Sequence, residues 1–374
     1  MSQLSFVFLG LSVTSSWGNG HATTYRGLVR ELCRRGHEVL FLERDVPYYA
    51  SQRDLPEPPF GRTELYGSLD ELRDRFSADV AGADVVVVGS YVPNGVAVGD
   101  WVLDTARGLR IFYDIDTPIT IAALEQGAPT YIEARQIPRY DLYLSFTNGP
   151  LMRRIQSEFR ALRVRPLCCS ADLETYYPEP QATFWDLGYI GTYSPDRQPA
   201  LERLLVEPAR GWAKGHFVVA GPQYPAFEWP RNVERYEHVP PPQHRAFYNA
   251  QRFTLNITRS AMLEAGYSPS IRLFEAAACG TAIISDVWPG LTDFFTPGRE
   301  LFVARSASDV LRLVREIGND ERIAVGRRGW ARIRREHTAA HRAEALERYV
   351  FEVPGVGGRR RAAAASVVNL GRQP

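Results

Sequence analysis

The stretch 266–290, GYSPSIRLFEAAACGTAIISDVWPG, carries the signals of one complete helix followed by one buried strand. Serine is favoured just before a helix and proline in its first turn, so Pro269 predicts a helix that begins at Ser268 or Ser270. Apolar residues then recur at helical spacing until Gly280, which favours the left-handed conformation that ends a helix. A short buried strand is expected directly afterwards, over 281–286.

Two charged side chains lie in the first half of this helix. Arg272 and Glu275 are three residues apart and therefore share one face, near an N-terminus whose free amides favour an anion. A guanidinium and a carboxylate there would suit a diphosphate and a ribose. An ordinary exposed ion pair on an amphipathic helix has the same spacing, so both interpretations stay open.

Length and charge indicate a two-domain globular protein. The 374 residues exceed one typical core, and the net charge of +1 gives no strong field toward nucleic acid or membrane. We therefore expect neither as a partner. Lys214 is the only lysine among the 44 basic residues, so phosphate contacts by side chains must come mostly from arginine.

Four cysteines occur, with neither metal-ligand spacing nor the pattern of a disulfide framework: Cys33, Cys168, Cys169 and Cys279. A reducing compartment fits them. The N-terminus leads directly into a strand without a signal-peptide pattern, and no apolar run reaches the roughly 18 to 20 residues that span a bilayer. We expect a cytoplasmic protein without integral membrane association.

The first half alternates strands and helices. A strand over 4–10, a serine- and glycine-rich loop, a helix over 23–35 and a strand over 38–42 are typical of a Rossmann-like opening. The glycines do not complete the G-x-G-x-x-G fingerprint, so NAD is not expected. Further strands are predicted over 83–89, 110–113 and 140–146, with helices over 69–76, 101–107 and 150–159 and a long irregular loop over 44–61.

A second alternating series follows a proline-flanked linker. It comprises strands over 186–190, 216–220 and 253–257 and helices over 199–207, 243–250, 309–317 and 321–337. This order predicts an N-terminal domain over 1–165, a linker over 166–180 and a C-terminal domain over 181–352, whose last helix could pack back on the first domain. The tail 355–374 has too little apolar surface to pack and is predicted to be disordered.

The fold class is therefore α/β, with parallel sheets covered by helices on both faces. Two Rossmann-like domains of similar size, without a dinucleotide fingerprint, favour the GT-B architecture, in which the two sheets face each other across a cleft. Three blocks also carry a family resemblance: SWGNGHATTYRGLVRELCRRGHEVLFLERDVPYYASQRDLP at 16–56, YIGTYSPDRQPALERLL at 189–205, and residues 255–301. They resemble the CgeB-like family, named for a spore-maturation protein and regarded as GT-B glycosyltransferases.

The resemblance covers most of residues 1–350. The linker segment SADLETYYP is also similar to the V-x-D-x-x-x-F-x-P crossing segment of many retaining GT-B enzymes. These likenesses imply a nucleotide-diphosphate sugar as donor, held mainly by the C-terminal domain without a metal or other cofactor. The acceptor, which the sequence does not identify, would bind the N-terminal domain.

The resemblance also implies roles for individual residues of the C-terminal domain. Glu275 matches the second of two glutamates eight positions apart and would contact the ribose. Tyr267 stands where the first would contact the sugar, so retention of configuration does not carry over. Arg197 and Arg272 would hold the diphosphate, together with amides at Ser268 and Ser270, unless Arg197 pairs with Asp196. The remaining candidates are Arg259 at a strand end, and Gly221 and Val239 beside the nucleobase.

The acceptor side is expected near the first helix. His21 ends the loop 18–21, where flexible glycines such as Gly20 allow a substrate to approach closely, and it is a candidate catalytic base. A capping or structural histidine is the alternative. Asp114 and Asp116 form a D-x-D after a strand, which would bind a metal in another fold; here Asp116 is the candidate carboxylate, as a base or a partner of His21, or simply caps a turn.

The expected function is transfer of a sugar from a nucleotide-diphosphate sugar, with uridine as the expected nucleoside. Two alternatives stay open. One is a catalytically silent binding or coat-associated protein of the same fold, and the other is an epimerase or hydrolase that acts on a nucleotide sugar. Tyr267 keeps the silent protein open because it replaces an expected glutamate.

Overall fold

The structure, a computed structural model, describes residues 3–354, which form two compact units. Unit 1 contains the chain up to Phe146, the segment Pro150–Leu167 and the chain from Ala340 onward. Unit 2 contains Thr147–Gly149 and Cys168–Ala339. The tail predicted to be disordered, 355–374, lies outside the described residues.

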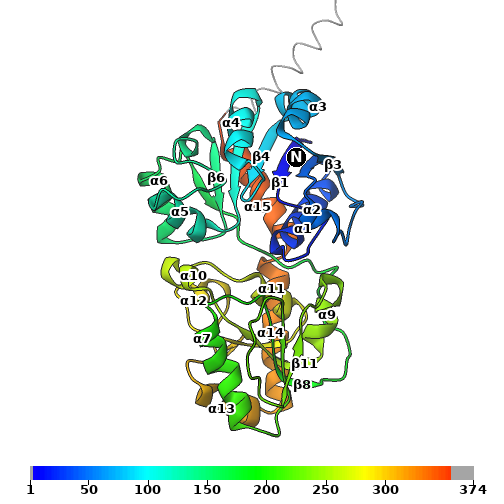
Figure 1. The fold of residues 1–374 in the computed structure, drawn as a ribbon, viewed down its shortest axis with the longest axis vertical. Coiled ribbons are helices and arrows are strands. Elements are labelled where there is room, and N and C mark those ends of the chain that lie inside the picture. The colour runs from blue at the N-terminus through cyan, green and yellow to red at the C-terminus, as the bar shows by residue number, and fades with distance from the viewer. Residues whose placement is uncertain (1–2, 355–374) are drawn as a thin grey trace, which may run out of the picture. The chain divides into compact units, whose positions relative to one another are not determined.

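Unit 1 is built on a seven-stranded parallel sheet in the order β3-β2-β1-β4-β5-β6-β7 (Figure 1). Its strands are β1 (Ser5–Gly10), β2 (Glu38–Arg44), β3 (Arg62–Tyr66), β4 (Val85–Gly89), β5 (Leu109–Asp114), β6 (Leu142–Ser145) and β7 (Val164–Pro166). Its helices are α1 (Gly20–Arg34), α2 (Pro47–Ala50), α3 (Leu69–Gly82), α4 (Gly95–Thr105), α5 (Thr117–Glu125), η1 (Ile137–Arg139), α6 (Pro150–Ser157) and α15 (Ala339–Glu352).

The last helix, α15, packs into the core of unit 1 although it follows all of unit 2 in the sequence (Figure 1). Leu346 and Val350 are buried there beside residues of β1 and β4. A polar contact adds to this packing: Leu4 N donates to His37 Nδ1 (3.1 Å), and His37 Nε2 therefore donates to the buried carboxylate of Glu347. Arg35 Nε also donates to that carboxylate (2.7 Å).

Unit 2 is built on a six-stranded parallel sheet in the order β10-β9-β8-β11-β12-β13. Its strands are β8 (Trp185–Ile190), β9 (Phe217–Ala220), β10 (Val233–Tyr236), β11 (Gln251–Asn256), β12 (Ala282–Ser285) and β13 (Phe302–Val303). Its helices are α7 (Gln198–Leu201), η2 (Glu202–Val206), α8 (Glu207–Gly211), α9 (Pro241–Asn249), α10 (Ser260–Ala265), α11 (Ile271–Ala278), α12 (Leu291–Phe294), α13 (Ala307–Glu316) and α14 (Asn319–Glu336).

Both sheets have the reversal of strand order that marks ligand sites in open α/β folds. In unit 1 the order reverses between β1 and β4, and in unit 2 between β8 and β11. Loops leave the carboxyl ends of two such neighbouring strands in opposite directions, which opens a crevice. Functional groups are therefore expected at these two points.

The alternating parallel pattern predicted from the sequence is confirmed, with local corrections. The long loop predicted over 44–61 contains α2, and β3, β10, α5 and α10 were not predicted. Helix α1 begins at Gly20 rather than near residue 23, because the side chain of Asn19 accepts the amide of His21 (3.1 Å). All four cysteines are free thiols.

Candidate functional site

At the reversal point of unit 2, Arg272 joins the ends of β8 and β11. Its Nε donates to Ile190 O (2.6 Å) and its Nη1 to Asn256 Oδ1 (3.3 Å), while its guanidinium carbon lies 4.7 Å from the ring centroid of Tyr189. The side chain is buried. The alternative of an exposed ion pair with Glu275 is therefore wrong.

Gly191, which follows β8, makes room for this guanidinium. A Cβ atom at Gly191 would lie 2.8 Å from Arg272 Nη2 and 2.7 Å from the hydroxyl of Tyr189. A larger residue would therefore require the end of the Arg272 or Tyr189 side chain to shift. The sequence analysis did not single out this glycine, although its position directly after a strand was a usable signal.

Arg197 lies in the loop between β8 and α7 and adds a second guanidinium to this region. Its Nη2 donates to Thr192 O (2.6 Å), and its buried Nε has no hydrogen-bond partner among the described residues. The proposed pair with Asp196 does not form, because that carboxylate accepts from Ser194 Oγ and from Ser260 N (3.0 Å). Arg197 is thus available to a ligand.

The positive charges of the arginines in this region repel one another. Burial lowers the pKa of Arg197, and the nearby charges of Arg272 and Arg259 lower it further. Neither Arg197 nor Arg272 forms an ion pair with a carboxylate in the described part of the chain. Arg259 directly follows Asn256–Thr258 and precedes α10. This cluster, Arg197, Arg259 and Arg272, therefore concentrates positive charge at the reversal point.

Arg272 lies in the first turn of α11, so the N-terminus of this helix belongs to the same region. The helix begins at Ile271 after Ser270, and the side chain of Ser270 makes no capping hydrogen bond. Of the two predicted starts, Ser270 is confirmed and Ser268 is wrong, because the helix starts later and the buried Ser268 hydroxyl accepts from Thr147 Oγ1 (3.0 Å). Leu273 N donates to Ser270 O (3.1 Å), which leaves the first two amides of α11, those of Ile271 and Arg272, without an acceptor among the described residues. The helix end at Gly280 has the predicted left-handed φ, 70°.

Glu275 points into the interior of unit 2, where two tyrosines hold it. Its carboxylate is buried, Tyr248 donates to Oε2 (3.1 Å), and Tyr176 donates a further hydrogen bond. Burial raises the pKa of Glu275 to about 7, although these hydrogen bonds and the charge of Arg272 act in the opposite direction. The tyrosines fix the carboxyl group in one orientation.

Tyr267 is held in a strained and closely packed position. Its φ is +54°, in the left-handed region that bulky residues rarely adopt. Cβ atoms at Gly149 and Gly290 would lie 2.5 Å and 2.6 Å from its ring, so the ring fits only because both neighbours are glycines. Its backbone nitrogen donates to Pro289 O (2.6 Å) and its carbonyl accepts from Asn148 N (3.0 Å).

The two residues predicted beside the nucleobase differ in their surroundings. Gly221, with φ of 144°, brings β9 against β8, since a Cβ there would lie 2.0 Å from Gly191 O. Close packing of the backbone thus explains why position 221 is a glycine. Val239 O accepts from His244 Nε2 (2.9 Å), whereas the Val239 amide has no hydrogen-bond partner among the described residues.

In unit 1 the loop after β1 is organised by a buried carboxylate. Glu43, near the end of β2, accepts from the amides of Val13 (2.7 Å) and Thr14 (3.0 Å) and from the hydroxyls of Ser12 and Thr14. Its oxygens are engaged by the loop, so Glu43 does not present itself to the ribose of a dinucleotide. The loop it fixes leads directly to Gly20 and His21, and the space beside Gly20 is open.

His21 lies in the first turn of α1, at the reversal point between β1 and β4. Burial lowers the pKa of His21 to about 4, so the ring is neutral at physiological pH. Its Nδ1 is buried without a hydrogen-bond partner among the described residues, and its ring contacts that of Tyr91 edge-on, with 5.3 Å between centroids. The structure therefore keeps His21 in the uncharged form that a base needs.

Asp116 reaches the same place through Tyr91, which follows β4. The Tyr91 hydroxyl donates to Asp116 Oδ2 (2.8 Å), so Tyr91 bridges the two residues predicted to be catalytic. The predicted direct partnership of Asp116 with His21 is replaced by this bridge. Asp114 is buried and accepts from Tyr143, Thr120 and the amide of Asp116, so its carboxylate is already engaged.

Tyr91 is the residue of unit 1 that the sequence analysis missed. Its one usable signal was its place directly after a buried strand at the reversal point. Within the described residues, no cluster of three or more His, Cys, Asp or Glu side chains could hold a metal ion. None of the helices between residues 3 and 354 is long and apolar enough to cross a bilayer.

The comparisons with known proteins point to one class of fold. A family model described as glycosyl transferase-like matches residues 197–348. The comparison with curated protein sequences gives no match. Similar solved structures include sucrose-phosphate synthase from Thermosynechococcus elongatus, at 14% identity and a TM-score of 0.67, which covers 94% of this chain and 100% of that chain.

Two further solved structures were obtained with sugar nucleotides. HepE from Anabaena in complex with UDP-glucose has 11% identity and a TM-score of 0.67, and an α-glucosyltransferase in complex with UDP-glucose and DNA has 12% identity and a TM-score of 0.69. Each covers 94% of this chain and 100% of its own. The chain therefore has the GT-B fold of two Rossmann-like domains, and its segment 197–348 is similar to the glycosyl transferase-like family.

Proposed function

We propose that the protein is a glycosyltransferase that uses a uridine-diphosphate sugar as donor. The arginine cluster of unit 2 supports this assignment more than any other single observation. Arg197 and Arg272 are guanidinium groups without carboxylate partners among residues 3–354, at a reversal point of the sheet and beside the uncapped start of α11. A diphosphate supplies the negative charge that these groups need.

The proposed chemistry consumes one donor and one hydroxyl acceptor. The acceptor oxygen forms a bond to the anomeric carbon of the donor sugar, while the bond from that carbon to the β-phosphate oxygen breaks. UDP leaves with the bonding electrons, and the acceptor proton passes to a base. Arg197, Arg259, Arg272 and the α11 amides would stabilise the charge that develops on the leaving diphosphate. This stabilisation requires no metal.

The other proposed donor contacts are two residues of the same unit. Glu275, held by Tyr176 and Tyr248, is the proposed ribose contact. The amide of Val239 is the proposed donor to the edge of the uracil, because it has no partner among the described residues. In unit 1, His21 is the proposed base, and Tyr91 and Asp116 position its surroundings.

The test combines binding with turnover. UDP and UDP-glucose should raise the melting temperature of the full chain, and incubation with UDP-sugars should release UDP, measured by chromatography. If neither ligand raises the melting temperature, the transferase assignment fails. Replacing Arg272 with glutamine should abolish the shift, and replacing the exposed Arg203 with glutamine should leave it unchanged.

One observation favours a second candidate, a donor-binding protein without turnover. Tyr267 stands where the resemblance expects a sugar-binding glutamate, and its ring is fixed between Gly149 and Gly290. UDP-sugar binding without UDP release, under any acceptor tried, would support this candidate. Release of UDP that depends on His21 would exclude it.

A further inference from the structure

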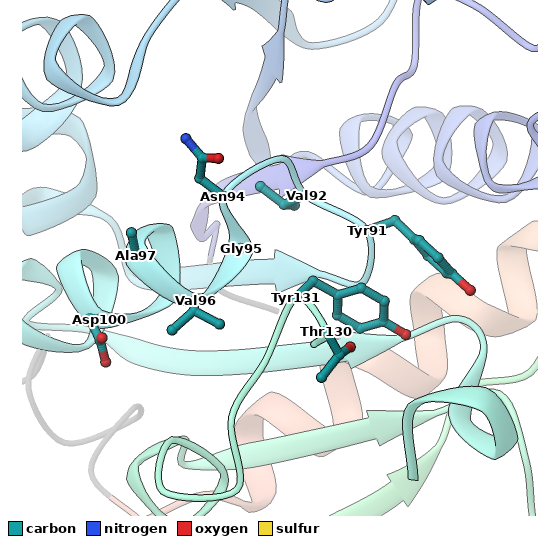
Figure 2. Close-up of a pocket in the computed structure, with 9 residues that line it drawn as sticks. All are labelled: Tyr91, Val92, Asn94, Gly95, Val96, Ala97, Asp100, Thr130 and Tyr131. Carbon is teal, nitrogen blue, oxygen red and sulfur yellow. The ribbon is translucent and has the colours of Figure 1, made fainter. Parts of the chain in front are cut away.

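We propose that unit 1 carries a binding pocket for an uncharged sugar ring next to His21, so that the acceptor is a carbohydrate hydroxyl. The part of this inference that makes the sugar an acceptor rests on the proposed function. Binding of the sugar ring can be tested by itself. The pocket has a volume of about 600 Å³ and lies over the loop after β4, the start of α4 and the segment before η1 (Figure 2). A volume of this order is typical of small-molecule sites.

Two tyrosines form the aromatic wall of this pocket. Figure 2 shows Tyr91 and Tyr131 beside each other, and their ring centroids lie 4.6 Å apart with an angle of 48° between the planes. Tyr91 is 36% exposed, so its ring is presented to solvent rather than packed into the core. The C–H face of a pyranose packs on such rings, while its hydroxyls remain free to bond at the rim.

Both rings are held in place before any ligand arrives. The Tyr91 hydroxyl donates to Asp116 Oδ2 (2.8 Å), and the Tyr131 hydroxyl bonds Thr120, which in turn donates to Asp114 (2.8 Å). Asp114 at the end of β5 and Asp116 just after it therefore anchor the two tyrosines, Asp116 directly and Asp114 through Thr120. A ligand that stacks on these rings binds without first having to order them.

The backbone around the pocket is strained in a way that serves this wall. Tyr91 has φ of +63° and Asn94 has φ of +56°, both in the left-handed region. Such strain persists at positions where the surrounding structure over-determines it, and these positions cluster at ligand sites. Gly95 adds a close approach, since a Cβ there would lie 2.4 Å from Tyr131 O. Tyr91 and Tyr131 lie side by side next to these strained positions.

The charges around the pocket select an uncharged ligand. Asp100 is the only residue lining it that ionises as an acid below neutral pH, and both of its oxygens accept from Arg135, at 2.8 and 2.9 Å. The other lining groups are aliphatic side chains, a threonine, an asparagine and the two tyrosines. No lining residue is a cation, and the guanidinium of Arg135 beside Asp100 is already paired with both Asp100 and Glu133, so the pocket lining offers a phosphorylated or carboxylated ring no unpaired cation.

The pocket also lies where an acceptor has to be. Tyr91 contacts His21 edge-on at 5.3 Å, so a ring stacked on the tyrosine wall would be next to the proposed base. Asn94 is exposed at the start of α4, and its side chain makes no capping hydrogen bond. The side-chain amide of Asn94 is the proposed contact to a hydroxyl of the sugar ring.

The experiment is saturation-transfer NMR on the full chain in the presence of UDP, which fills the donor site. The probes are the methyl glycosides of glucose, galactose and mannose, with glucose 6-phosphate and glucuronate as charged counterparts. At least one neutral glycoside should receive saturation, and both charged probes should receive less. No transfer to any neutral glycoside, or stronger transfer to a charged probe, would overturn the assignment.

Variants place the binding in this pocket. Tyr91→Gly removes half of the wall while suiting the left-handed backbone, and it should weaken binding at least tenfold. Val96→Phe fills the pocket, leaves both tyrosines in place and should have the same effect. Phe351→Ala removes an aromatic of unit 1 with nearly the same exposed fraction, 37%, and should change nothing. Binding that survives both pocket variants would refute the proposal.

The outcomes separate this inference from the proposed function. If both pocket variants still bind glycosides normally and still bind and release UDP, the transferase assignment holds and the pocket assignment is wrong. Glycoside binding that depends on Tyr91 in a protein that binds no UDP would keep the pocket and remove the transferase.

Discussion

Replacing Arg197 with alanine should weaken UDP binding without destabilising the free protein. The guanidinium gives up one hydrogen bond to Thr192 O, a net contribution of about 0.5 to 1.5 kcal/mol. Removing a buried charge that Arg272 and Arg259 repel offsets this loss. The free energy of unfolding of the unliganded variant should therefore stay within about 1 kcal/mol of the wild type.

The loss of ligand binding should be much larger. A hydrogen bond to a charged group contributes about 1.5 to 3 kcal/mol, which corresponds to a roughly 10- to 150-fold increase in the Kd for UDP. At a UDP concentration about 100 times the wild-type Kd, ligand stabilisation is about 2.7 kcal/mol, and it should fall to between about 0.3 and 1.3 kcal/mol in the variant. Urea unfolding with and without UDP measures both quantities.

The matched control is Arg203→Ala, an exposed arginine in η2, six residues further along the chain. It should keep the full stabilisation by UDP. A variant at Arg197 that binds UDP as tightly as the wild type, or that is several kcal/mol less stable without ligand, would show that this guanidinium is structural and that the reasoning is wrong.

Three further predictions use the other buried groups. Burial raises the pKa of Glu275 to about 7, so protonation of Glu275 contributes stability that is fully present below about pH 4.5 and is lost as the pH rises through about 7. Glu275→Gln should remove this pH dependence of the free energy of unfolding in urea, up to about 3 kcal/mol. The same pH dependence in the variant and the wild type would contradict the prediction. His21→Gln should lower turnover by roughly 10²- to 10⁴-fold with little change in UDP affinity. In the wild type, kcat/KM should not fall as the pH is lowered through 6.5, because burial lowers the pKa of His21 to about 4. Glu347→Ala should destabilise α15 by about 3 to 5 kcal/mol in hydrogen exchange, whereas the exposed Glu344→Ala should cost no more than about 0.5 kcal/mol; equal protection in both would refute the anchoring role.

The sequence predicted the order of elements well because each signal was local. The stop at Gly280 depends on one left-handed residue, and the strand that became β12 depends on a short apolar run. Elements without such signals were missed. The strand β3 is one example, since RTELY alternates weakly and its pairing with β2 depends on residues about 20 positions away.

The candidate site was predictable by residue type but not by partner. Arg197, Arg272 and Glu275 were found from spacing and resemblance, yet their surroundings came only from the fold. Spacing left an exposed ion pair open for Arg272 and Glu275, whereas both are buried and hold different partners. A helical spacing places two side chains on one face and does not state what covers that face.

Tyr91 shows the other limit of sequence reasoning. A tyrosine in a Gly-Ser-Tyr-Val-Pro loop gives no sign of a left-handed φ or of a hydrogen bond from its hydroxyl to Asp116, 25 residues further along the chain. Tyr267 has the same character, since its place depends on Gly149 and Gly290. Both residues became visible only once the fold had assembled the contacts that hold them.

The central claim is that the arginine cluster of unit 2 binds a diphosphate. Calorimetric titration of the full chain with UDP and with uridine tests it most directly, because the two ligands differ only in the diphosphate. Two or more charged hydrogen bonds predict that UDP binds at least about 100-fold more tightly, and that added salt narrows the difference. Equal affinity for the two ligands, or no binding of UDP, would contradict the claim.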